Sequence, residues 1–130
     1  MAEVKSNIRR AMKLGGKNVQ ISMYEELGLL FTHLSAWTSE DKSQAHHLRE
    51  MHGLLAALAG ELLTCEIDLS VEAIRRGRAE ATTSYVKFCQ RTEQEVDPSL
   101  RASISDWRKE ERSGTVKQVL DQVIAQLAPE

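Results

Sequence analysis

Residues 40–65 read EDKSQAHHLREMHGLLAALAGELLTC, and this stretch decides the fold class. Large apolar residues recur in it at alternating steps of three and four, the spacing of one helix face in a coiled-coil-like packing. They are Leu48, Met51, Leu55, Leu58 and Leu62. A row of small residues lies almost opposite: Gly53, Ala56, Ala57, Gly60 and Thr64. The stretch therefore predicts a long helix, covered on both faces, in the middle of a helical bundle.

The small-residue row has two interpretations. Glycine inside a helix costs about 0.5–1 kcal/mol relative to alanine, so the two glycines indicate that another segment packs closely there. The first interpretation is close packing against a matching row of the next helix, since helices approach most closely where side chains are small. That row is Ala73, Gly77, Ala81 and Ser84. The second is a shallow groove that binds an amphipathic helix of a partner protein. The predicted partner-binding residues are then Gly53, Ala56, Ala57, Gly60, Thr64, Ala73 and Gly77.

Signals before this stretch predict two further helical segments. A short basic helix over residues 3–14 ends at a pair of glycines and leads into an extended linker over residues 15–22. Ser22 and Glu25 match the capping-box pattern. We therefore expect the next helix to begin at Ser22 and to extend to about Trp37.

The later helices also carry start signals. Ser39 is the expected N-cap of the 40–65 helix, and Asp97 followed by Pro98 is a cap with proline at the first helical position. The expected later helices cover about residues 40–65, 70–94, 97–113 and 115–127.

These elements predict an all-α protein, an antiparallel up-down bundle of four to five helices. The length of 130 residues fits one domain. We expect a basic arm and linker over residues 1–22 and the bundle over residues 23–128. No segment recurs at the period of a helical solenoid.

Composition limits the environment of the chain. Hydrophobic residues make up 42% and charged residues 28%, as in globular proteins, and the net charge is -2. No apolar run approaches the roughly 20 residues of a membrane helix, and no secretory signal precedes the first helix. We therefore expect a cytoplasmic protein with no membrane partner, in which Cys65 and Cys89 are buried free thiols.

Two histidines are candidates for metal chemistry. His46 and His47 lie four and three residues before Glu50. A di-iron bundle needs Glu-x-x-His motifs on two helices together with glutamates from two others, and no second helix offers a matching set. A solvated helix start is the better interpretation, so we expect no metal and no cofactor.

His52 is the candidate for phosphoryl chemistry. It lies in an apolar helix and is followed by glycine, which is similar to histidine phosphotransfer domains. In that family a Lys-Gly pair follows the histidine by three and four residues, where this chain has Leu55 and Ala56. No nucleophile elbow, phosphate loop or dinucleotide fingerprint is present. The sequence therefore predicts a protein that is not an enzyme.

Nucleic-acid binding is a minor alternative. Arg75, Arg76 and Arg78 form a basic cluster, and the first 17 residues carry five basic side chains. Acidic residues dilute the field around the cluster, and no aromatic side chain is interleaved with it for base stacking. We expect such binding to be unlikely.

Residues 19–31 read VQISMYEELGLLF, and this segment resembles the start of the flagellin export chaperone family. The matching residues are Val19, Glu25, Glu26, Leu27, Leu29 and Leu30. Residues 21–24 differ from the Thr-Ala-Ser-Pro turn of that family, and residues 66–69 differ from its Gly-Gly-Glu segment. The resemblance implies a bacterial cytoplasmic bundle that wraps the aggregation-prone tail of an exported subunit.

The sequence thus predicts a chaperone or adaptor that holds an amphipathic or disordered segment of another protein, with flagellar or secretion export as its setting. The alternative is a regulatory protein or a structural homo-oligomer that buries its apolar face in a homodimer. Nucleic-acid binding and histidine phosphotransfer rank below both.

Overall fold

A computed structural model gives the structure of the chain and describes residues 2–36, 42–65 and 67–127. Its helices are α1 (Ala2–Ser35), α2 (Lys42–Leu63), α3 (Glu72–Thr92), α4 (Pro98–Glu110) and α5 (Gly114–Leu127). No strand occurs in these ranges. The predicted all-α helical bundle is therefore confirmed. The expected helix end at Trp37 and the expected cap at Ser39 lie outside the described residues.

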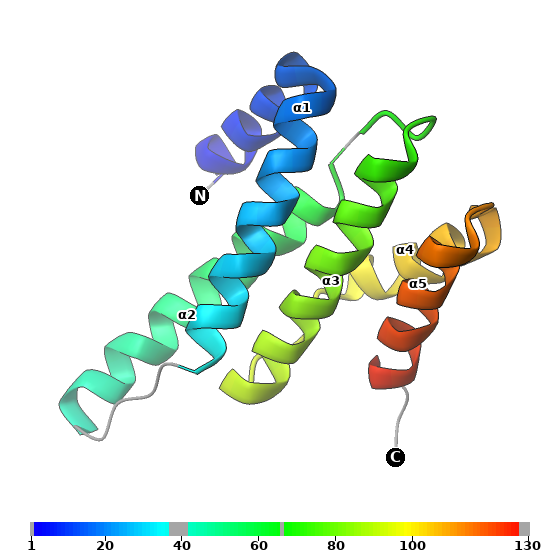
Figure 1. The fold of residues 1–130 in the computed structure, drawn as a ribbon. Helices are drawn as coiled ribbons and strands as arrows, with labels where there is room; N and C mark the ends of the chain where they lie inside the picture. Colours follow the sequence, from blue (N-terminus) through cyan, green and yellow to red (C-terminus); the bar gives the residue numbers. More distant parts are fainter. Residues whose placement is uncertain (1, 37–41, 66, 128–130) are drawn as a thin grey trace.

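Helix α1 contains a sharp kink where the sequence predicted a linker. Only Gly16 has a non-helical backbone, with φ 72° and ψ -163°, a region that glycine reaches without steric cost. The extended linker over residues 15–22 was therefore wrong, and Ser22 lies inside a helix instead of capping one. The helix resumes at once because Gln20 and Tyr24 share a buried face. Figure 1 shows the two halves of α1 at an angle to each other.

Helix α3 is the centre of the bundle. It contacts α1, α2 and α5, and its most extensive contact is with α1. Figure 1 shows α3 between the α1–α2 pair on one side and the α4–α5 pair on the other. The prediction that the 40–65 helix is central was wrong, because α3 and not α2 contacts helices on both sides of the bundle.

An aromatic cluster joins the first three helices. The ring of Phe31 lies 5.7 Å from that of Tyr85 and 4.7 Å from that of Phe88, centroid to centroid. The ring of His52 meets Phe88 edge-on at 5.2 Å. Each fully buried side chain of this size contributes about 1.5–3 kcal/mol to folding. This cluster fixes α1 and α2 against α3.

The connection from α3 to α4 is held by specific hydrogen bonds. The Asp97 carboxylate accepts from the backbone N–H of Ser99 at 2.8 Å and of Leu100 at 3.4 Å, which confirms the predicted cap. The Asp97 N–H in turn donates to the Tyr85 hydroxyl at 3.2 Å. The start of α4 is therefore tied to α3.

Cys65 and Cys89 are buried and unbonded to each other, which confirms the prediction of free thiols. Burial raises the pKa of both thiols, that of Cys89 to about 11. Within the described residues, none of the helices combines the length and the apolar character that crossing a bilayer requires.

Candidate functional site

The small-residue row of α2 is covered partly by the chain that connects α3 to α4. A Cβ atom added to Gly60 would lie 2.6 Å from Oδ2 of Asp97, and one added to Gly53 would lie 3.5 Å from Oε1 of Gln94. The covering segment is thus residues 94–97. The expectation that this row packs against the row of the next helix was wrong, because residues 94–97 lie over the α2 row while α1 lies over the α3 row.

The small-residue row of α3 is covered by α1. A Cβ atom on Gly77 would lie 3.3 Å from Cβ of Tyr24, and one on Gly28 would lie 3.9 Å from Cα of Ala81. Because glycine has no side chain, the two helix backbones can approach each other closely at these positions. The glycines of α1 and α3 therefore explain why this is the largest helix contact of the bundle.

The seven predicted partner-binding residues do not form one open surface. Ala56 and Gly60 are buried, Gly53, Ala73 and Gly77 are half-buried, and Ala57 and Thr64 are exposed. A partner on α2 would reach the last two without displacing Asp97. Binding at these residues stays a prediction.

The open apolar surface lies on the other side of α2, between its leucine face and α1. There the two helices leave a hollow of about 380 Å³. The residues that line it, which we name the α1–α2 groove, are Ser22, Met23, Glu26, Leu27, Leu30 and Leu62. Leu30 remains 43% exposed, and the neighbouring Leu29 remains 61% exposed. Covering this groove would remove large apolar side chains from water.

The sequence contained a signal for this groove that we interpreted as internal packing. In the sequence, Leu27, Leu30 and Leu34 follow one another at steps of three and four, which is one apolar helix face, and the leucine face of the 40–65 helix was expected to be covered. In the structure only Leu62 of that seam is buried, while Leu48, Met51, Leu55 and Leu58 are half-buried. The part of this pattern that lines the groove is Leu27 and Leu30 of α1 together with Leu62 of α2.

The basic arm is part of α1 and is attached to α2. Arg9 forms an ion pair with Glu61. Arg9, Arg10 and Lys13 line a hollow of about 580 Å³ next to Thr64 and Cys65. The arm is thus in contact with the end of α2.

The histidines do not form a reactive site. His52 is buried, its Nε2 has no hydrogen-bond partner among the described residues, and burial lowers its pKa. Phosphotransfer requires an exposed histidine, so this position does not support it. His46 Nε2 lies 3.1 Å from Oε1 of Glu50 on an exposed helix face. Nowhere in the described ranges do three or more metal-ligating side chains gather to hold a metal ion.

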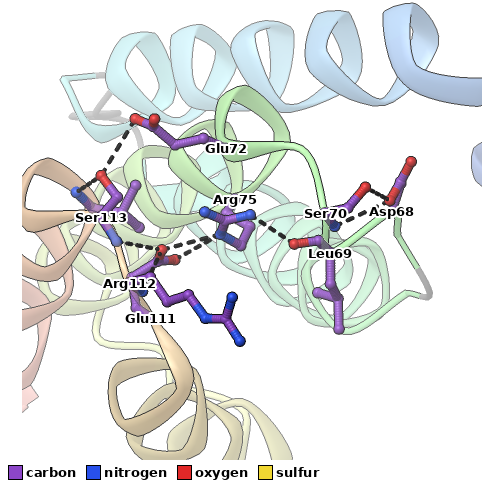
Figure 2. Close-up of polar contacts among 9 residues, drawn as sticks. Asp68, Leu69, Ser70, Glu72, Arg75, Glu111, Arg112 and Ser113 are labelled. Carbon is purple, nitrogen blue, oxygen red and sulfur yellow. Dashed lines mark hydrogen bonds and ion pairs between the residues drawn. The ribbon is translucent and has the colours of Figure 1, made fainter.

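The arginines of the predicted basic cluster separate in the structure. Arg76 is exposed and Arg78 is buried. Arg75 donates from Nε to both carboxylate oxygens of Glu111 at 3.0 Å, and from a terminal nitrogen to the Leu69 carbonyl at 2.6 Å (Figure 2). They therefore do not present one basic surface of the kind that binds a phosphate backbone.

Glu111 is the polar centre of the turn between α4 and α5. Besides Arg75, its Oε2 accepts from the backbone N–H groups of Arg112 and Ser113, both at 3.1 Å (Figure 2). Burial raises the pKa of Glu111, but the hydrogen bonds from Arg75 and these amides outweigh it, so the pKa lies below its usual range. Sequence reasoning missed this residue because no local pattern marks it.

Comparison with known proteins decides the family. Residues 1–126 match the family described as ECM29, C-terminal ARM-like repeats. No curated protein and no solved structure gives a significant match. The resemblance to flagellin export chaperones was wrong, since it covered 13 residues whereas this match covers nearly the whole chain, and the matching family is eukaryotic. The chain belongs to the family of ECM29 C-terminal ARM-like repeats.

Proposed function

We propose that this chain is a non-enzymatic protein-interaction module that holds an amphipathic helix of another protein in the α1–α2 groove. The observation that carries the proposal is the exposure of Leu30 in the groove, next to the exposed Leu29. ARM-like helical repeats generally bind other proteins. Stacked helical units of this kind offer extended surfaces to their partners.

The shape and chemistry of the groove favour a helix as the occupant. Helix α1 presents an apolar stripe of Met23, Leu27 and Leu30, and α2 adds Leu62 beside it, so a third helix could pack along α1 with its ridges in these grooves. The partner would place apolar residues at helical spacings of three and four over Leu27, Leu30 and Leu62. Glu26 at the rim favours a basic residue on the partner next to these anchors.

A cytoplasmic location is part of the proposal. The two free buried cysteines support it, because thiols persist in reducing compartments. The absence of catalytic activity is likewise proposed and rests on the interaction role typical of the family.

Paired substitutions test the groove. Leu30→Glu places a charge in the groove, whereas Leu54→Glu makes the same change at an exposed position of α2 that does not line it. The probe is a fluorescent amphipathic peptide of about 18 residues, five helical turns, with leucines at the anchor spacing and lysines elsewhere. We expect at least tenfold weaker binding to Leu30→Glu and unchanged binding to Leu54→Glu, measured by anisotropy.

Equal binding of the peptide to both variants and to the unmodified protein would refute the groove as the site. The same proteins, studied by light scattering over a concentration series, separate the homodimer alternative. A mass that doubles with concentration, and does so less in Leu30→Glu, would mean that a second copy of the chain is the occupant.

A further inference from the structure

A second hollow lies on the other side of α3, next to α4. Its volume is about 750 Å³, and it is formed by the start of α3, by α4 and by the turn that follows α4. Six charged side chains line it: Arg75, Arg78, Arg112, Asp106, Glu110 and Glu111. The charges sum to zero, but they are not all paired with one another.

The guanidinium of Arg78 is a buried cation without a carboxylate partner. The residue is 7% exposed, and its Nε has no hydrogen-bond partner in the described part of the chain. Its Cζ lies 3.8 Å from the centroid of the Trp107 ring, a cation–π contact. Burial lowers the pKa of Arg78 to about 10. A buried charge of this kind costs free energy unless an opposite charge or hydrogen bonds compensate it.

Glu111 and Glu110 favour the charged form of Arg78 through space, but no carboxylate of the hollow bonds to its guanidinium in the described structure. Glu111 is fully engaged by Arg75 and by two backbone amides. Asp106 and Glu110 are exposed, and neither forms a hydrogen bond or ion pair with Arg78 in the described structure. The Arg112 side chain extends from the turn beside Glu111 without entering the Arg75–Glu111 bonds (Figure 2). Among the described residues Arg78 is therefore a buried cation of the hollow that feels nearby carboxylates but bonds to none of them.

We propose that this hollow binds a single carboxylate, the side chain of an Asp or Glu of a partner protein, on the guanidinium of Arg78. A guanidinium presents a planar fork that matches a carboxylate with two parallel hydrogen bonds. The Trp107 ring packs on the Arg78 guanidinium and restricts its orientation. Little side-chain conformational entropy is therefore lost when the carboxylate binds. The site lies on a different face from the α1–α2 groove and does not depend on it.

The exposed carboxylates select among anions. Asp106 and Glu110 at the rim repel a second negative charge. A phosphate dianion or a run of acidic residues is therefore disfavoured, and a lone acidic residue with neutral or basic neighbours is favoured.

The test uses the full chain labelled with ¹⁵N and a probe with one carboxylate, N-acetylglutamate α-methylamide. We expect saturable shifts of the Trp107 indole N–H and of the Arg78 Nε–H resonance. Arg78→Met should abolish the response, and Arg78→Lys, which keeps the charge but loses the fork, should weaken binding at least tenfold. Arg76→Met is the matched control, since Arg76 is exposed on the same helix and does not line the hollow; it should bind the probe normally.

Three results would overturn the proposal. One is a response of the unmodified protein that rises linearly without saturating, and another is an unchanged response in Arg78→Met. The third is tighter binding of inorganic phosphate than of the probe at equal ionic strength at pH 8, which would make the hollow a phosphate site. If Arg78→Met does not fold, the comparison of probe binding by the unmodified protein and by Arg78→Lys tests the proposal, and equal binding by the two would overturn it.

Discussion

The two sides of α3 are held together by different kinds of contact. On the α1–α2 side the contacts are close approaches at glycines and stacked aromatic rings, as between Gly28 and Ala81 and between Phe31 and Phe88. On the α4–α5 side, apolar packing is supplemented by charged and capping contacts, centred on Glu111 and Asp97. We name these the apolar side and the polar side.

The comparison distinguishes helices whose position is determined by apolar packing from helices whose position also depends on directional hydrogen bonds. The long helix α1 meets α3 along many turns, so shape and burial determine its position. Helices α4 and α5 have 13 and 14 residues, and short helices have fewer side chains with which to fix an orientation. Helix α5 packs on α3, and directional hydrogen bonds at Asp97 and Glu111 additionally fix the two ends of α4.

The largest expected effect concerns the apolar side. Phe31→Ala removes a fully buried ring that contacts Tyr85 and Phe88. We expect a loss of about 3–5 kcal/mol in the free energy of unfolding, as for other buried aromatic residues, measured by urea denaturation. Leu29→Ala on the same helix, at an exposed position, should change it by less than about 0.5 kcal/mol. Similar losses for the two variants would contradict the packing described for α1.

The next effect concerns the polar side. Glu111→Ala leaves Arg75 and two backbone amides without their acceptor, which should cost about 2 kcal/mol. Glu110→Ala, an exposed neighbour, should stay within about 0.5 kcal/mol of the original protein. If the two variants are equally stable, the turn between α4 and α5 does not depend on directed bonds.

Acid should affect the polar side through the same residue. The folded-state pKa of Glu111 lies below the usual value of 4.5. The stability that it contributes is therefore fully present above about pH 4.5 and is lost as the pH falls through the lower, folded-state value. Glu111→Gln should flatten this part of the pH profile of unfolding, and an unchanged profile would count against the assignment.

The sequence predicted the helices of the polar side better than those of the apolar side. Asp97–Pro98 is a local signal, and α4 begins there as expected. The glycine pair near residue 15 was also local, but its meaning depended on distant contacts. The first helix does end at this pair, since Gly16 is non-helical, but a second helix follows directly in place of the expected linker because Gln20 and Tyr24 are buried against other elements. Such burial is not visible in the local pattern.

The same distinction explains the candidate sites. Periodicity identified the small-residue rows, but it could not show that Asp97 lies over Gly60 or that Tyr24 lies over Gly77. It likewise identified the leucine stripes without showing that they remain half-open. Whether Arg78 has a bonded carboxylate depends on where Glu111 points, which is a tertiary property.

A smaller effect is expected at the boundary between the two sides. Asp97→Ala removes the N-cap of α4 and should cost about 1 kcal/mol. Asp97→Asn keeps an acceptor and should cost less. Because Asp97 also lies over Gly60, the substitution should increase hydrogen exchange at both α4 and α2, and an increase limited to α4 would mean that the contact with α2 contributes nothing.

The smallest expected effect is a pH dependence of stability that comes from the apolar side. His52 is a titratable group within it, and burial lowers its folded-state pKa below 6.5. Above about pH 6.5 both the folded and the unfolded chain hold His52 neutral. As the pH falls below that value the unfolded chain binds a proton first, so stability declines. His52→Leu should remove this decline between pH 6.5 and 5, whereas His47→Leu, at an exposed position, should leave it in place. This window lies above that of Glu111, so one pH series measures the two sides of α3 separately. A decline that persists in His52→Leu would mean that the ring is solvated in solution, and that the apolar side is looser around Phe88 than its packing indicates.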